Sequence, residues 1–263
     1  MKKISLILWA MFFVFVSDLY GDNESLKDKH NLQISKNPAG FTENKGQFRD
    51  QYGKPNPEVL YMADFGGMKV QLRRDGFSYE TYQVKPKWVD PATIPYKILT
   101  FTENGDTLES WPGMAEAQKN LMYHFHRVDV ELKGVKLNPE ILAEGSSGET
   151  KRYVNVENGG ESIEVAAFSQ VRYNGVYPGI DLVVYSQNEN GGFKYDFILS
   201  PGVNLSAIEL EYKGAETLEL EKDGNLNLKT GFGILSESIP ACYTEDATGN
   251  RKEVSGIGYH LEG

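Results

Sequence analysis

The feature that most constrains this fold is an alternation of apolar and polar residues with a period of two, repeated along most of the chain. HRVDVELKG at residues 126–134 alternates valine and leucine with acids and lysine, and AIELEYKG at 207–214 has the same pattern. Such alternation is typical of antiparallel strands with one packed face and one face in water. The sequence therefore predicts an all-β fold, an antiparallel β-sandwich-like domain with long loops and at most a short helix. The best candidate for that helix is GMAEAQKNLMYH at residues 113–124.

Two Asp-Gly pairs mark turns between such strands. MKVQLRRDGFSYETYQV at 68–84 contains Asp75-Gly76, with Val70 and Leu72 on one face before it and Phe77 and Tyr79 after it. TLELEKDGNLNLKT at 217–230 contains Asp223-Gly224 between two leucine-rich segments. Because Asp-Gly favours the backbone of tight turns, the second stretch is predicted to be a β-hairpin.

The N-terminus predicts export. Residues 1–17, MKKISLILWAMFFVFVS, combine two lysines with an apolar run too short to cross a bilayer as a helix, the form of a secretory signal. We assign residues 1–21 to a signal peptide, with cleavage after Ser17 or Gly21 left open, 22–39 to a flexible leader, and 40–263 to the β-sandwich-like domain. An alternative divides that domain into two β subdomains near residues 135–150, and the C-terminus is open to being incomplete. The proline-rich stretch 85–119 is predicted to be an insertion.

Charge and cysteine content narrow the classes of partner. The net charge of −10 and the lack of a basic cluster argue against nucleic acid and anionic membrane surfaces as partners. The single cysteine, Cys242, lies far from the signal, so no lipid anchor and no internal disulfide are expected. We also expect no membrane insertion after signal removal. We expect Cys242 to be buried and inert, and the protein to be extracytoplasmic, either secreted or on the outer cell surface.

Two carboxylates in one predicted hairpin, residues 176–202, are the first candidate site. If Ser186 faces Phe193, then Asp181 and Asp196 are diagonal neighbours on the second face, together with Tyr185. Their expected separation, on the order of 7 Å, is near that of a pair of glycosidase carboxylates. The favoured alternative is structural, with Asp181 accepting backbone N–H groups at the YPG turn and Asp196 on an exposed face.

A pair of histidines is the second candidate site. His124 and His126 lie on one side of a strand, the spacing of a two-histidine metal pair, but a third ligand is not evident. No GxSxG, HExxH, P-loop or GxGxxG motif occurs in the sequence. We therefore expect no catalytic residues, no metal and no cofactor.

Several stretches give the chain a family resemblance. They are GFTENKGQF (40–48), VLYMADFGGMKVQLRRDGFSY (59–79), HRVDVELKG (126–134), VRYNGVYPGIDLVVY (171–185), KYDFILSPG (194–202) and IELEYKGAETLELEKDGNLNLKT (208–230). In these the chain resembles an N-terminal β-domain of unknown function found in large exported Bacteroidota-type proteins, ahead of SBBP (β-propeller-like) repeats and C-terminal gliding-motility or type IX sorting segments. The resemblance implies a non-catalytic structural or adhesion-type module whose partners are cell-surface proteins or extracellular glycans. The alternative is a carbohydrate-binding or carbohydrate-active domain that uses Asp181, Asp196 and surface tyrosines.

Overall fold

The fold was analysed in a computed structural model, which describes residues 5–11, 40–50, 52–65, 67–86, 98–101, 107–110, 121–136, 138–155, 161–187, 192–246 and 248–262. Within these ranges the structure is all-β and its paired strands are antiparallel, as the sequence predicts. The only other regular element there is a 3-10 turn at Leu205–Ala207.

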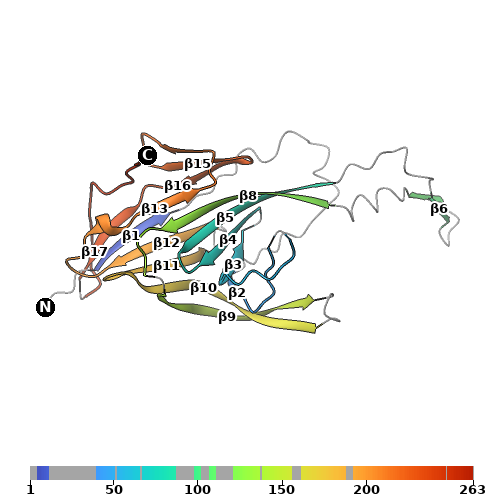
Figure 1. Cartoon of the computed structure of the whole chain (residues 1–263), viewed down its shortest axis with the longest axis horizontal. Helices are drawn as coiled ribbons and strands as arrows, with labels where there is room; N and C mark the ends of the chain where they lie inside the picture. Colours follow the sequence, from blue (N-terminus) through green and yellow to red (C-terminus); the bar gives the residue numbers. More distant parts are fainter. Residues whose placement is uncertain are drawn as a thin grey trace. The chain divides into compact units, whose positions relative to one another are not determined.

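One large sheet contains most of the strands (Figure 1). Its order is β13-β8-β5-β4-β3-β2-β10-β11-β12-β1-β17-β18, and β9 also pairs with β10. The bounds are β1 Ser5–Met11, β2 Phe41–Glu43, β3 Tyr61–Asp64, β4 Met68–Arg73, β5 Gly76–Pro86, β8 Leu121–Leu132, β9 Glu140–Asn155, β10 Glu161–Tyr177, β11 Ile180–Gln187, β12 Gly192–Leu199, β13 Leu210–Lys213, β17 Ala241–Glu245 and β18 Arg251–Glu253.

Two smaller sheets complete the described structure. One has the order β14-β15-β16, with bounds Thr217–Leu220, Leu226–Thr230 and Gly233–Glu237. The other pairs β6, Ile98–Phe101, with β7, Thr107–Ser110. The chain divides into two compact units, one of residues 1–81 and 126–263 and the other of residues 82–125. The first unit contains residues 135–150, and the second contains the stretch 85–119.

The core of the first unit follows the predicted alternation. Val128, Val130 and Leu132 of β8 are at most 3% exposed, and they pack in one cluster with residues of β4, β5, β10, β11, β12, β15 and β16. The intervening Asp129 and Glu131 carry ion pairs with Arg73, Arg127 and Lys213. The three-stranded sheet contributes Leu226, Leu228 and Leu235 to the same cluster, so its leucines cover part of the large sheet in a sandwich-like arrangement.

Both Asp-Gly hairpins form. β4 and β5 are antiparallel, with Arg73 opposite Gly76, and β14 and β15 pair Leu218 with Leu228. Gly76 has φ 152° and lies against β8, where an added Cβ would be 2.0 Å from the carbonyl oxygen of Val130. The glycine therefore serves both the turn and the close approach of a neighbouring strand.

The N-terminal segment and the start of β8 bear on the predicted signal peptide and the predicted short helix. Residues 5–11, inside the predicted signal, form β1 between β12 and β17. The short helix was expected to reach residue 124, but residues 121–124 belong to β8. The strand that contains Val128 and Val130 therefore begins before His126, at Leu121. Residues 113–120 lie outside the described ranges. No helix in the described part of the chain has the length and apolar character needed to cross a membrane.

Candidate functional site

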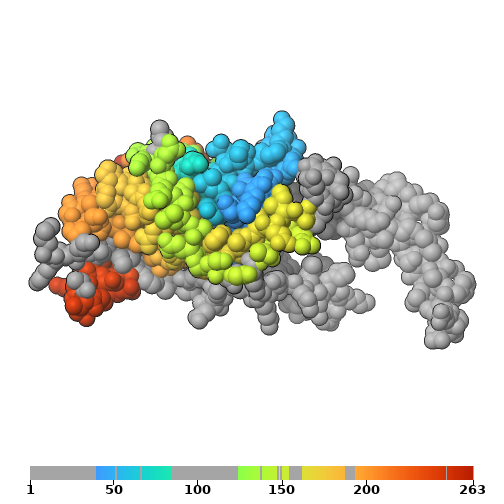
Figure 2. Space-filling model, turned by 90° about the horizontal axis from the view of Figure 1, so that it is seen from below, coloured from blue at the N-terminus to red at the C-terminus, as the bar shows by residue number. Residues whose placement is uncertain are grey.

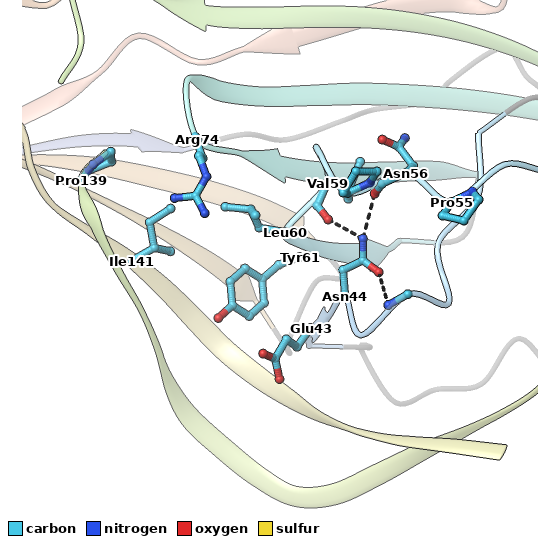
Figure 3. A pocket seen from close by; sticks show the side chains of 12 residues that line it. Glu43, Asn44, Pro55, Asn56, Val59, Leu60, Tyr61, Arg74, Pro139 and Ile141 are labelled. Atoms are coloured by element: carbon cyan, nitrogen blue, oxygen red, sulfur yellow. Dashed lines mark hydrogen bonds between the residues drawn. The ribbon is translucent and has the colours of Figure 1, made fainter. Parts of the chain in front are cut away.

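A pocket of about 400 Å³ lies beside β2 and β3 (Figure 3). Its walls come from the loop after β2, the residues that lead into β3, the β4–β5 turn and the start of β9. Figure 2 shows the blue segment that contains β2 against the yellow-green segments of β9 and β10 on one face of the molecule. The lining side chains with the most functional interest are Glu43, Asn44, Tyr61, Arg74 and Ile141.

The ENKGQ motif builds one wall of this pocket. The Asn44 Nδ2 group donates to the carbonyl oxygens of Asn56 at 2.8 Å and Val59 at 2.6 Å, while its Oδ1 accepts from the Gly46 N–H at 2.9 Å. Gln47 bridges the same turn, donating to the Glu43 carbonyl at 2.5 Å. These amides hold the loop against the segment that precedes β3, so Asn44 and Gln47 have structural roles in this motif.

Three other side chains can present chemistry to a ligand. Glu43 and Tyr61 are opposite each other on β2 and β3, and Arg74 is exposed at the β4–β5 turn. In Figure 3 these three side chains and Ile141 lie around the same space. Burial, and secondly the Glu43 charge, raise the pKa of Tyr61 above its usual value, so the phenol stays neutral and can donate a hydrogen bond. A carboxylate, a guanidinium and an aromatic ring can together bind a small polar molecule.

The hairpin with the two candidate carboxylates has the predicted register. Ile180, Leu182 and Val184 pair with Leu199, Phe197 and Tyr195, and Ser186 pairs with Phe193. Asp181 and Asp196 are therefore diagonal neighbours on the second face. Neither carboxylate belongs to the lining of the pocket described above.

Asp181 supports the backbone close to the expected turn. The β10–β11 register shifts between Tyr173 and Tyr177, and Gly175 in this bulge has φ 62°. The Gly175 N–H donates to Asp181 Oδ1 at 2.7 Å, and Arg172 lies 3.5 Å from Oδ2. Asp181 thus satisfies a donor that the irregular ladder leaves free, two residues before the YPG turn itself.

Asp196 was expected on an exposed face, and this expectation is wrong. Asp196 is 2% exposed and its Oδ2 lies 3.1 Å from Nζ of Lys194, which is 4% exposed. Burial raises the pKa of Asp196, which the adjacent ammonium opposes, while burial lowers the pKa of Lys194. Burial and then the charge of Asp196 raise the pKa of Tyr185. Arg251 of β18 is close enough to influence both charges.

The two candidate metal ligands differ in environment. His124 is exposed. In His126, Nε2 is 2.8 Å from the Gly214 carbonyl and Nδ1 accepts from the Gly231 N–H at 3.1 Å, so both ring nitrogens contact the backbone. Within the described ranges, no three His, Cys, Asp or Glu side chains gather as a metal site would require.

Sequence reasoning missed the most unusual charged group. Glu237 on β16 is 0% exposed, and four tyrosine hydroxyls surround its carboxylate. Tyr79 is 2.9 Å from Oε1, and Tyr212, Tyr195 and Tyr259 are 2.7, 3.2 and 3.4 Å from Oε2. Burial raises the pKa of Glu237 to about 7, although the tyrosine hydrogen bonds lower it. The alternation along the strand could have revealed its burial. Glu237 lies on the same face of β16 as Leu235, and Leu235 belongs to the core.

The family model described as "Domain of unknown function (DUF7948)" matches residues 41–263. No curated protein matches the chain. No solved structure matches it either. The match covers both the pocket and the Glu237 cluster.

Proposed function

The chain belongs to the DUF7948 family, and from this premise we propose that it is a non-catalytic structural or adhesion-type module of an exported bacterial protein. The observation that carries the proposal is that the most distinctive polar residues of the chain are engaged in contacts within the fold. Asn44 and Gln47 hold a loop, Asp181 serves a bulge and Asp196 is in a buried ion pair. Polar groups engaged in this way stabilise a fold and are not available to a substrate.

Export is supported by sequence. The lysine-led apolar run at residues 1–17 has the form of a signal, and the resemblance to N-terminal domains of Bacteroidota-type surface proteins points the same way. The free, buried Cys242 is compatible with an oxidising compartment, because a buried thiol has no accessible partner. In this proposal the module precedes SBBP-type repeats and presents them, or itself, at the cell surface.

Carbohydrate binding is the second candidate, and the pocket favours it more than the hairpin does. The Tyr61 ring can stack on a sugar, while Glu43 and Arg74 can hydrogen-bond to its hydroxyls. By contrast, Asp196 is buried, so the Asp181–Asp196 pair does not offer two accessible carboxylates.

The experiment combines processing with ligand binding. Expression in a Gram-negative host is expected to give an extracytoplasmic product about two kilodaltons lighter than the full chain, because roughly 17–21 residues are removed. That product is then screened against polysaccharides, together with Tyr61→Ala and, as a control, Tyr52→Ala, which changes an exposed tyrosine outside the pocket. The structural module is expected to bind none of them.

Two results would contradict the proposal. An unprocessed N-terminus in the extracytoplasmic fraction would contradict signal removal. If a glycan binds the wild type and Tyr52→Ala but not Tyr61→Ala, carbohydrate binding replaces the structural role as the proposed function.

A further inference from the structure

One strand position in the large sheet depends on the N-terminal segment. β1 is antiparallel to β12, from Leu6 opposite Leu199 to Met11 opposite Lys194, and it is also antiparallel to β17. Among the described strands, β17 pairs with β1 and β18 alone, so the β17–β18 hairpin joins the sheet only through β1. Because adjacent strands lie about 4.8 Å apart, β12 and β17 flank a position one strand wide, about 10 Å across.

Removal of the signal would empty this position. Cleavage after Ser17 or Gly21 takes all of β1 away and leaves unpaired N–H and C=O groups on the facing edges of β12 and β17. While β1 is present, Phe197 on the core face of β12 and Asp196 on its other face are both at most 2% exposed. Without β1, the inner edges of β12 and β17 are unpaired, and an unpaired strand edge is a template for another strand.

We infer that the position between β12 and β17 is an acceptor site for an extended apolar strand donated by a different polypeptide, and that β1 of the signal peptide fills it in the precursor. The inference rests on the proposed signal removal. The donated strand runs antiparallel to both neighbours for five or six residues, because the ladder of β1 with β12 has six residue pairs and its ladder with β17 has five. Main-chain hydrogen bonds on both edges supply affinity in this mode, and alternate side-chain positions supply specificity.

The register defines the chemistry of the donated strand. One row of its side chains lies between Phe197 of β12 and Cys242 of β17, both at most 3% exposed, and this row must be apolar. The other row lies between Asp196 and Ala241. A second copy of this chain is a poor donor, since every described strand already has a partner within its own chain and a processed copy has lost its signal peptide as well.

Cys242 is a natural reporter of occupancy. It is 3% exposed, and burial raises the pKa of its thiol to about 11, so the thiol reacts slowly while β1 is present. The probe is a lysine-flanked peptide with the sequence SLILWAM of residues 5–11. The control peptide has proline in place of its second leucine, because a proline there removes a donor that a doubly paired strand needs.

The experiment measures thiol labelling of three samples: the full chain retained in the cytoplasm, the processed chain, and the processed chain with either peptide. Labelling of Cys242 is expected to be at least about tenfold faster in the processed chain than in the full chain, since the β17–β18 hairpin opens locally. The SLILWAM peptide should restore the slow rate and the proline peptide should not. Hydrogen exchange of amides 194–199 and 241–245 should change in parallel.

The results that would contradict the acceptor site can be distinguished from a failure of the export proposal. Slow labelling and protected amides in a processed chain without peptide would show that the chain closes the position itself. A concentration-dependent dimer with slow labelling would make a second copy the donor. Mass spectrometry reports signal removal independently of both. A retained signal peptide would refute the proposed processing, and its own β1 would then fill the position.

Discussion

At the residue scale, burial decides the role of each polar side chain more than its identity does. Asp181 and Asp196 are diagonal neighbours in one hairpin, yet Asp181 accepts a backbone N–H in a bulge and Asp196 shares a buried ion pair with Lys194. The two substitutions should therefore differ in cost.

Replacing Asp196 is expected to be strongly destabilising. Asp196→Ala leaves the Lys194 ammonium buried without this carboxylate, which should lower the free energy of unfolding by about 3–5 kcal/mol. The double variant Lys194→Met with Asp196→Leu should recover most of that loss, because it removes both buried charges. Urea melts of the three proteins measure this, and a loss within about 0.5 kcal/mol for Asp196→Ala would mean that the pair is solvated.

Replacing Asp181 should cost less. Asp181→Ala removes the acceptor of the Gly175 N–H and should lower the free energy of unfolding by about 1–3 kcal/mol. Asp181→Asn keeps an acceptor oxygen at the same position and is the matched control. If both variants melt alike, the hydrogen bond to Gly175 does not contribute to stability.

At the element scale, hairpins and strand alternation organise the sheets, while glycines allow neighbouring strands to approach. Asp223-Gly224 joins β14 to β15 as the sequence predicts, and the register of β11 with β12 agrees with its apolar pattern residue by residue. The β4–β5 turn has a second requirement, because Gly76 contacts the backbone of β8.

The contact at Gly76 predicts a large effect of a single methyl group. Gly76→Ala would bring Cβ to 2.0 Å from the Val130 carbonyl oxygen at a φ of 152°, so we expect a loss of about 3 kcal/mol or more. Gly134→Ala is the control, since its φ of 66° is strained but nothing lies within 4 Å, and it should cost about 1–2 kcal/mol. Equal denaturation midpoints for the two variants would argue against the backbone contact.

At the scale of the whole first unit, Glu237 connects the small sheet to the large one. Its partners Tyr79, Tyr195 and Tyr212 lie on β5, β12 and β13, and Tyr259 follows β18. Because the pKa of Glu237 is raised to about 7, the packing of β16 against the large sheet should depend on pH.

The stability of the protein should therefore fall between about pH 4.5 and pH 7. The pKa of Glu237 is raised from 4.5 to about 7 on folding, so below both values the folded and unfolded states bind the same proton and no penalty arises. As pH rises through this window, the unfolded state releases the proton first, and the native state loses up to about 3 kcal/mol. Above pH 7 the penalty is constant.

Glu237→Gln should remove this pH dependence, because it keeps a neutral, hydrogen-bonding side chain of the same shape. At pH 8 the variant should be more stable than the wild type, whereas at pH 5 the difference should be small. Glu58→Gln, which changes an exposed acid, is the control and should follow the wild-type curve. Melts across the pH range measure this, and a Glu237→Gln curve parallel to the wild type would contradict the raised pKa.

The sequence by itself determined what depends on near neighbours. Alternation of apolar residues assigned the strands and their core faces, and Asp-Gly pairs located two hairpins, because strand parity and turn chemistry are local properties. Only the tertiary structure decided which second faces are covered. Asp196 is buried although it lies on the second face of its hairpin, and four tyrosines from distant segments surround Glu237. The pocket likewise joins residues of β2 and β9 that are about a hundred positions apart. A period of two tells which residues share a face, but burial of that face depends on segments far away in the chain.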